Sequence, residues 1–420
     1  MTKQADFKRR VRARMAKTGE SYATARTRLL AGHPGVTPDD SPLDWMPGAL
    51  HISNGDATDV PGTGLARRVV YWRDILHEGP VLEVPPTELR RIRVDYLATH
   101  HGVDHAGTMR QFTERDQALE ANRDGEYVLW FEADLYDQLQ LTEILARLAG
   151  LGVPAECITL ICIGEHAGIA HFGGLGELTA AQLRELPDTD ACARLTPAAL
   201  ELATRAWAAF RAPAPEGLAA IAAARLGELR FLGEAFDRLS REYPATRDGL
   251  SLTERRVLAA VADGAPSAGP TAGPTAGRAV ARAMARETRP FMGDTTYLHR
   301  MHRMAAGPNP LLRLEPSDPP DRPVELATGV RLTDTGARVL AGQADQIALN
   351  GIDRWIGGVH LRGHHVPWRW DDGTETIVLY RLDGTVILWA RKTRAVESPA
   401  RGTGSLRPAT PSQRSRAWPR

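Results

Sequence analysis

The sequence has little cysteine and no long apolar run. Its three cysteines, Cys157, Cys162 and Cys192, form no Cys-x-x-Cys pair, and their odd number argues against a disulfide framework. No stretch approaches the roughly 20 apolar residues that cross a bilayer, and the basic N-terminus lacks the apolar segment of a secretory signal. Lysine is scarce and arginine abundant, a bias typical of a GC-rich bacterial genome. We therefore expect a cytoplasmic protein with no membrane partner.

Several common catalytic and nucleotide-binding motifs are also missing. The sequence contains no Gly-x-Gly-x-x-Gly, no Walker-type lysine and no serine in a Gly-x-Ser-x-Gly elbow. Its histidine pairs have no cysteine or carboxylate nearby at the spacing of a zinc site. These absences argue against a P-loop nucleotidase, an α/β-hydrolase and a zinc finger.

The formal net charge of +1 hides an uneven distribution. Residues 1–32 carry nine Lys or Arg and two acidic residues, and residues 391–420 carry eight and one. The body between these two arms is therefore strongly acidic. Basic arms favour contact with nucleic acid or another polyanion. The alternative is that they are solvated tails, whose attraction salt screens within about 10 Å.

The composition and the apolar pattern divide the chain into seven segments. They are a basic helical arm (1–32), a linker (33–47), an α/β domain (48–190), a helical region (191–245), a winged-helix-like domain (246–345), a β-hairpin segment (346–390) and a disordered basic tail (391–420). The linker is rich in Pro, Gly and Asp, and the tail is rich in Ser, Pro and Arg.

The α/β domain alternates apolar strands with helices. Strands are predicted at 49–53, 69–72, 127–131 and 157–163, and helices at 87–99, 107–122 and 135–148. This alternation predicts a Rossmann-like, mostly parallel sheet that is flanked by helices on both faces.

Each of these strands is apolar along its length and becomes polar where it ends. The polar residues are Asn54 and Asp56 after the first strand, Arg73, Asp74, His77 and Glu78 after the second, Glu132, Asp134 and Gln138 after the third, and Glu165 and His166 after the fourth. Ligands of open parallel sheets bind beyond the carboxyl ends of the strands, where the strand order reverses. We therefore expect these residues to share one edge and to form a ligand site.

The residue types suggest a role for each position. Asp74, Glu78, Glu132 and Asp134 are the candidate catalytic residues, because carboxylates act as acids, bases or metal ligands. Asn54, Asp56, Arg73, His77 and Gln138 are the candidate ligand-binding residues, and Arg73 has the planar fork that clamps a phosphate or carboxylate. The oxygen-rich set Asp56, Glu132 and Asp134 would suit Mg²⁺ or Mn²⁺.

Each of these roles has a structural alternative. Asp56 can cap a turn, and Arg73 and Asp74 can each form an ion pair with a residue elsewhere in the fold. Asp134 can complement the start of the helix that follows it. The sequence leaves both interpretations open.

Several stretches of the chain are similar to a known family. They are residues 51–56 (His-Ile-Ser-Asn-Gly-Asp), 72–80 (Trp-Arg-Asp-Ile-Leu-His-Glu-Gly-Pro), 129–139 and 172–179. In this order they resemble the family named domain of unknown function 1835, over about residues 50–185. Residues 349–361 look like the C-terminal region of its longer members. The resemblance implies an architecture but no activity, because the family has no established biochemistry.

The C-terminal half is predicted to begin with helices at 196–212 and 217–243. A winged helix is then suggested by helices from 252, at 278–287 and at 293–304, by strands at 311–314 and 330–332, and by a last helix from 333. An Ala-Gly-Pro-Thr repeat at 268–277 reads as a flexible insertion. The third helix of such a fold enters the major groove of DNA, where Arg300 and Arg303 would be exposed and contact phosphates. The alternative is that this domain only packs on the first domain or on a partner.

The β-hairpin segment contains predicted strands at 368–370 and 376–380 and a turn at Asp383-Gly384. Two hypotheses follow for the whole chain. The first is a metal-assisted enzyme that acts on a phosphate-bearing or nucleotide-like small molecule, an anion, at the sheet edge. The second is a non-catalytic ligand sensor or nucleic-acid-binding regulator that uses the winged-helix-like domain and the basic arms. The first hypothesis predicts that the named carboxylates converge around an open pocket.

Overall fold

The computed structural model describes residues 45–55, 57–167, 169, 172–264, 273–315 and 324–380, and the backbone of 386–387. Outside the described residues lie the predicted arm, most of the linker, Asp56, residues 268–272 of the repeat, the Asp383-Gly384 turn and the basic tail. Within the described ranges, none of the helices has both the length and the apolar character needed to cross a membrane.

The N-terminal part of the chain forms a five-stranded sheet. Its strands are β1 (Leu50–Ser53), β2 (Val69–Tyr71), β3 (Tyr127–Glu132), β4 (Ile158–Ile163) and β5 (Cys192–Arg194), in the order β2-β1-β3-β4-β5. The first four strands are parallel, and β5 is antiparallel to β4. The predicted α/β fold with a mostly parallel sheet is therefore confirmed, and β5 is an edge strand that the apolar pattern did not predict.

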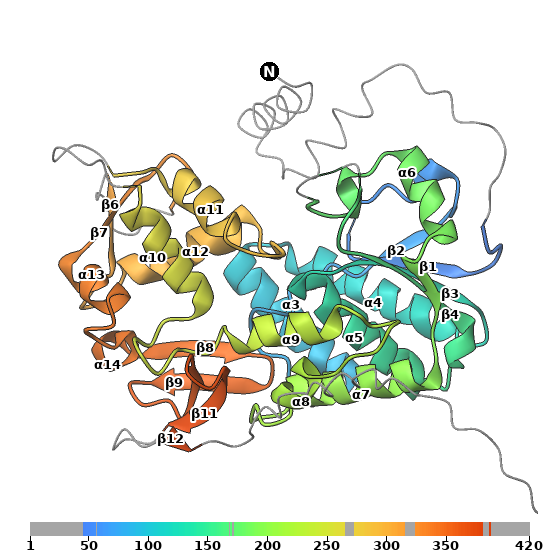
Figure 1. Ribbon diagram of the computed structural model, residues 1–420. Coiled ribbons are helices and arrows are strands. Elements are labelled where there is room, and N and C mark those ends of the chain that lie inside the picture. The colour runs from blue at the N-terminus through green and yellow to red at the C-terminus, as the bar shows by residue number, and fades with distance from the viewer. Residues whose placement is uncertain are drawn as a thin grey trace, which may run out of the picture.

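Helices cover the two faces of this sheet unequally (Figure 1). Leu129 and Phe131 of β3 point into a large core with α3 (Pro86–His101), α4 (His105–Ala121) and α5 (Leu135–Gly150). Val128 and Trp130 point to the opposite face, which α6 (Ala180–Glu185), short 3-10 turns and loop residues cover. These 3-10 turns are Pro61–Thr63, Leu175–Glu177 and Leu186–Asp188, whereas the turn Ala155–Cys157 packs on the large core. Because successive strand residues face opposite ways, the unbroken apolar run of β3 supplies both cores.

The helical region packs beneath α5. It contains α7 (Pro197–Arg211), α8 (Leu218–Ala222) and α9 (Leu232–Ser240). The prediction of one helix over 217–243 is wrong, because the chain leaves the helix between α8 and α9. The break lets α8 and α9 pack against each other and bury both apolar faces, which a single straight helix could not do.

The C-terminal half begins with helices and a strand pair in the predicted order. These elements are α10 (Leu252–Ala262), α11 (Ala276–Met284), α12 (Asp294–Ala305), β6 (Leu312–Glu315), β7 (Gly329–Leu332), α13 (Asp334–Leu340) and α14 (Gln346–Asn350). β6 and β7 pair antiparallel. Ser251 caps α10, and its hydroxyl and the side chain of Glu254 form a reciprocal capping box.

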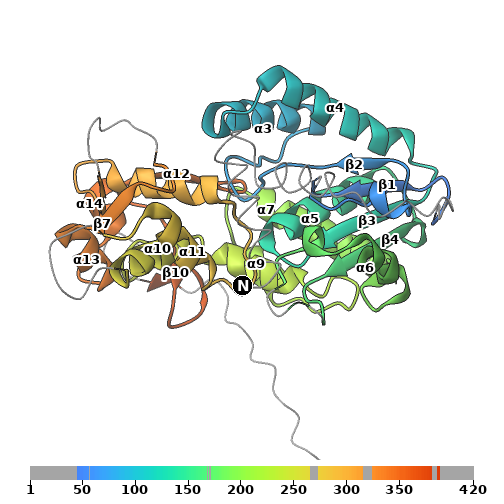
Figure 2. The ribbon, with the colours of Figure 1, turned by 90° about the horizontal axis from the view of Figure 1, so that it is seen from above.

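Two β units complete the fold. They are the hairpin β8 (Ile352–Ile356) and β9 (Val359–Gly363), and the sheet β10 (Trp368–Asp371), β11 (Thr376–Tyr380) and β12 (Val386–Ile387). The tip of the β8-β9 hairpin contacts the α/β domain, since the amide of Val81 donates to the carbonyl of Gly357 at 2.9 Å. The amide of Gly358 donates to the carbonyl of Phe210, also at 2.9 Å. Figure 2 shows α10 to α14 as a second lobe beside the sheet and its helices.

Candidate ligand-binding site

The polar residues that follow β2 do not all meet the ends of the other strands. After Tyr71 the chain turns at Arg73, which has a left-handed φ of 52°. Asp74 then pairs with Arg93 of α3 at 2.8 Å, and both side chains are only 1% exposed. Asp74 was predicted to act as a catalytic base in an open pocket. The structure instead places it in a buried ion pair, which is the alternative that the sequence left open.

The ends of β1 and β3 do come together. These strands are neighbours in the sheet. β2 lies beside β1 on one side of this pair, and β4 and β5 lie beyond β3 on the other side, so the strand order reverses between β1 and β3. Five residues meet there, and we call them the switch-point cluster: Asn54, Glu132, Asp134, Asp137 and Gln138. The side-chain amide of Asn54 donates to Asp137 Oδ1 at 2.6 Å, and the backbone amide of Glu132 donates to Asp137 Oδ2 at 2.6 Å. Gln138 Nε2 donates to the Glu132 carbonyl at 2.7 Å.

The carboxyl groups of the switch-point cluster resist ionisation. Burial raises the pKa of Glu132 well above its usual value, and the negative charges of Asp137 and Asp134 raise it further. Burial also raises the pKa of Asp137 well above its usual value, and it raises the pKa of Asp134 to about 6. Burial and the mutual repulsion of these negative charges therefore make each carboxyl group harder to ionise than an isolated carboxylic acid.

The predicted metal set cannot be assembled from these residues alone. Among the described residues, no three His, Cys, Asp or Glu side chains form a group that could hold a metal ion. Asp56, the third member of the predicted set, lies outside the described residues. The Mg²⁺ or Mn²⁺ site therefore stays a prediction.

His77 and Glu78 belong to a different place, a cleft between the α/β domain and the C-terminal half. We call it the interdomain cleft, and its wall includes His77, Glu78, Tyr96, Arg300, Arg303, Arg354 and Trp355. Its volume is about 550 Å³. The loop after β2 forms one wall, and α12 and β8 form the other. The cleft thus combines residues predicted to bind a ligand with residues predicted to bind DNA.

A buried network of charges lies at the bottom of the interdomain cleft. Arg300 pairs with Glu78 at 3.3 Å and with Glu242 at 2.7 Å, and His101 approaches Glu78 at 3.3 Å. Burial by itself would raise the pKa of Glu78, but the hydrogen bond from His101 and the positive charge of Arg300 outweigh it and lower that pKa below its usual range. Glu78 is therefore a permanently charged anchor for Arg300 and is not suited to proton transfer near neutral pH.

Some buried polar nitrogens of the residues that line this cleft have no partner among the described residues. Within the described part of the chain, both ring nitrogens of His77, Nε of Arg300 and Nη1 of Arg354 are buried without a hydrogen bond. Burial lowers the pKa of His77 to about 4, so its imidazole is neutral at pH 7, and it packs edge-to-face with Phe291 and Tyr136. A buried polar group that lacks a partner costs about 1–3 kcal/mol. A bound polar ligand would remove that cost.

The prediction that Arg300 is exposed on the third helix is wrong. Its side chain is 8% exposed, because the α12 face that carries Tyr297, Arg300, Met301 and Met304 packs inward. Arg303 lies on the exposed side, and its guanidinium donates to the backbone carbonyl of Asp353 at 2.8 Å. Of the two arginines proposed to contact DNA phosphates, only Arg303 is therefore exposed on α12.

Sequence reasoning missed several residues of both sites. Asp137 was not among the candidate site residues, yet its carboxylate accepts from Asn54 after β1 and from the backbone of Glu132 in β3. Arg354 and Trp355 were noticed only as part of the stretch that resembles a family. The signal that could have identified them is the run Asp-Arg-Trp in a short strand. Charged groups that a strand partly buries need partners or a ligand.

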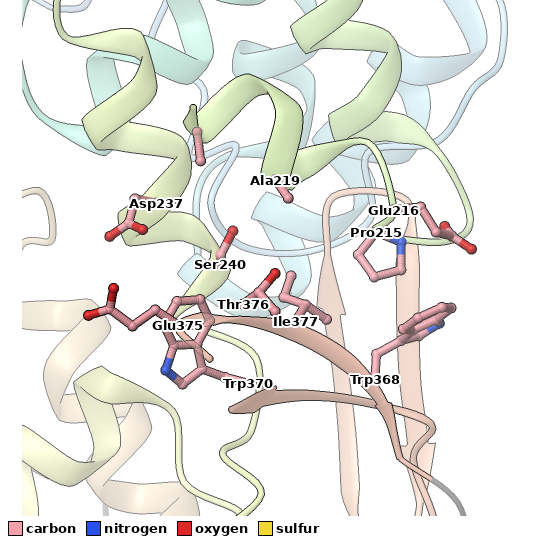
Figure 3. Close-up of a pocket in the computed structure, with 11 residues that line it drawn as sticks. Pro215, Glu216, Ala219, Asp237, Ser240, Trp368, Trp370, Glu375, Thr376 and Ile377 are labelled. Atoms are coloured by element: carbon pink, nitrogen blue, oxygen red, sulfur yellow. The ribbon is translucent and has the colours of Figure 1, made fainter. Parts of the chain in front are cut away.

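Figure 3 shows a smaller cavity between α8, α9, β10 and β11, lined by Trp368 and Trp370 with Asp237 and Glu375 at its rim. Its volume of about 20 Å³ accommodates roughly one water molecule. A substrate would not fit there, so the interdomain cleft is the better candidate site.

Comparison with known proteins adds no assignment. No family model matches the sequence, and no curated protein is similar to it. The resemblance to the domain of unknown function 1835 therefore stays a prediction.

Proposed function

We propose that the protein binds a small phosphate-bearing anion in the interdomain cleft, beyond the carboxyl end of β2. The observation that carries this proposal is the set of buried donors without partners on His77, Arg300 and Arg354 around an open volume. Guanidinium groups bind phosphate with two parallel hydrogen bonds, and charged hydrogen bonds are the stronger ones.

The size and the wall of the cleft support the same ligand class. Its volume of about 550 Å³ lies within the roughly 300–1,000 Å³ of small-molecule sites. Arg303 is exposed, and among the described residues it forms no ion pair with a carboxylate. An incoming anion would meet Arg303 first and the inner donors of Arg300 and Arg354 afterwards.

Two stretches that resemble the domain of unknown function 1835 meet in this cleft. The first supplies His77 and Glu78, and the second, residues 349–361, supplies Arg354 and Trp355. Their meeting supports the proposal that the resemblance and the ligand site belong together.

We also keep the winged-helix-like interpretation of residues 246–345 as a proposal, supported by the order of α10, α11, α12, β6 and β7. In our proposal this region forms a wall of the ligand cleft. Because Arg300 is engaged in buried ion pairs, DNA binding through α12 would depend on Arg303 and its exposed neighbours.

A catalytic role is a second candidate, and the raised pKa values of Glu132, Asp134 and Asp137 favour it. A carboxyl group with a raised pKa can donate a proton at a higher pH than an ordinary carboxylic acid, which suits general acid catalysis. A metal-assisted reaction would require Asp56 to join them. Turnover of a phosphate ester that is lost in Glu132→Gln and kept in Arg205→Ala would support this role.

The binding proposal is tested by calorimetry and thermal melting with inorganic phosphate, a sugar phosphate and a nucleoside monophosphate. A ligand at 100 times its Kd stabilises the folded state by about 2.7 kcal/mol, which is easily measured. We expect Arg303→Ala to weaken binding at least 10-fold, since a charged hydrogen bond contributes about 1.5–3 kcal/mol.

The matched control is Arg205→Ala on α7, because Arg205 is exposed, pairs with Glu201 and lines neither cleft. The proposal is wrong if none of the probes binds, or if Arg303→Ala and Arg205→Ala bind equally well.

A further inference from the structure

A second cleft adjoins the interdomain cleft. We call it the hairpin cleft, because β8, β9 and α14 form much of its wall, and its volume is about 480 Å³. The two clefts share Glu254, Arg303, Asp353 and Arg354 in their walls. The two clefts therefore adjoin along these four residues, and we call this place the junction.

The junction of the two clefts carries positively charged side chains that could bind an anion. Arg303 and Arg354 both stand there, and Nη1 of Arg354 is buried without a hydrogen-bond partner in the described chain. Arg354 pairs with Glu254 through its other terminal nitrogen, so Nη1 is left to a ligand. A phosphate at the junction would meet donors from α12 and from β8 at once.

The interdomain cleft offers a flat aromatic surface. Trp355 lines it and stacks against His360 with ring centroids 4.1 Å apart and planes within 9° of parallel. The stack holds the indole in one orientation. Base-to-aromatic stacking contributes about 1–3 kcal/mol per base and tolerates any base, so this wall suits a nucleobase.

The hairpin cleft offers an amide beside apolar side chains. Gln346 lines it together with Met304 and Ile352. Its Oε1 accepts from Asn350 at 2.7 Å, which fixes the amide and leaves its NH₂ donors without a partner among the described residues. An oriented amide next to an apolar surface is suited to the hydrogen-bonding edge of a base.

We propose that the two clefts act as one groove that binds a dinucleotide, with its linking phosphate at the Arg303 and Arg354 junction and one nucleoside in each cleft. This inference rests on the proposed anion-binding function and names its ligand class. A mononucleotide would fill only one half of the groove. A long single strand is disfavoured, because the carboxylates of Glu78, Glu254 and Asp353 line the same walls and repel a continuous row of phosphates.

The test compares affinities of the full chain for inorganic phosphate, a nucleoside monophosphate, a dinucleotide with a phosphodiester link, a dinucleotide with a diphosphate link and a ten-nucleotide single strand. We expect at least one dinucleotide to bind 10-fold or more tightly than the mononucleotide. The affinities for the two dinucleotides show whether the groove prefers a phosphodiester or a diphosphate link.

Two variants test the two halves. Trp355→Leu and Gln346→Ala should each weaken dinucleotide binding at least 5-fold and leave the affinity for inorganic phosphate unchanged, whereas Arg303→Ala should weaken both. Gln346→Ala removes no core side chain, so it remains informative if Trp355→Leu folds poorly.

The dinucleotide inference is overturned if the mononucleotide binds as tightly as both dinucleotides, if the single strand binds more tightly than either, or if neither variant changes dinucleotide affinity. None of those results would contradict the proposed function, which is anion binding that depends on Arg303. Failure of every probe to bind would instead overturn the proposed function itself.

Discussion

Arg300 and Glu78 lie 222 positions apart in the chain, and their side chains form an ion pair with 3.3 Å between Nη2 and Oε1. Arg300 comes from α12, and Glu78 comes from the loop between β2 and α3. Nη1 of Arg300 also donates to Glu242 at 2.7 Å. The pair therefore joins the two halves of the fold and forms the floor of the interdomain cleft.

Replacing Arg300 with methionine should destabilise the protein strongly. The change leaves the carboxylates of Glu78 and Glu242 buried without their shared partner, and breaking a buried pair in this way costs about 3–5 kcal/mol. Urea denaturation measures the loss. Arg91→Met is the control, because Arg91 forms an exposed pair with Asp95 whose removal should cost under about 1 kcal/mol. Equal losses in the two variants would contradict the role assigned to Arg300.

Gly357→Ala should loosen the contact between the β8-β9 hairpin and the α/β domain. Gly357 has a φ of 58°, and an added Cβ would clash with the carbonyl of Phe210. We expect a loss of about 2 kcal/mol or more, and faster hydrogen exchange at the Val81 amide, which donates to Gly357. Gly363→Ala separates strain from clash, since Gly363 also has a positive φ but open space around it. Unchanged exchange at Val81 in Gly357→Ala would refute the expectation.

His77 should make the protein less stable as the pH falls below about 6.5. Its pKa is lowered by burial to about 4, so between pH 6.5 and pH 4 the unfolded chain takes up a proton that the folded chain does not. By pH 5 this linkage removes about 2 kcal/mol from the free energy of unfolding. In His77→Phe that part of the pH dependence should vanish. Parallel curves for the two proteins between pH 7 and pH 5 would count against a buried neutral imidazole.

Asp134 should have the opposite effect on stability. Burial raises its pKa to about 6, so the folded state holds a proton that the unfolded state releases from about pH 4 upward. The contribution of Asp134 to stability is therefore fully present below about pH 4 and is lost as the pH rises through 6. Asp134→Asn keeps an oxygen to accept from the Asp137 amide, and it should raise the free energy of unfolding by about 1–3 kcal/mol at pH 7.5 but not at pH 4.

The control for Asp134→Asn is Asp104→Asn, the same change at the exposed N-cap of α4. Urea denaturation at pH 4 and at pH 7.5 measures both variants. If Asp104→Asn gains as much stability at pH 7.5, the effect does not come from burial of Asp134.

Local sequence patterns were enough to predict most of the elements. β3 and α5 were predicted to within about two residues, because a continuous apolar run followed by a helical apolar stripe is a local signal. The antiparallel strand β5 was not predicted. It has three residues, and its place in the sheet depends on pairing with β4, which no local pattern records.

The site was only partly predictable for a related reason. Asn54, Glu132, Asp134 and Gln138 meet as expected, because the ends of neighbouring parallel strands share an edge. His77 and Glu78 lie elsewhere, because the chain turns at Arg73 and carries them to α12. The partner of a buried charge is fixed by the tertiary fold. The sequence therefore showed that Glu78 needs a partner, and only the structure showed that the partner is Arg300.

The hydrogen bond between Val81 and Gly357 has a consequence for folding during synthesis. The ribosome makes β2 long before the β8-β9 hairpin, and Gly357 follows Val81 by 276 positions in the chain. The wall of the cleft that includes Glu78 is therefore incomplete until the hairpin has been made. Contacts of such long sequence separation form late and slow the folding of a chain. Until then the nascent chain holds Glu78 without Arg300, so the buried ion pair at the floor of the cleft can form only after the C-terminal half has been made.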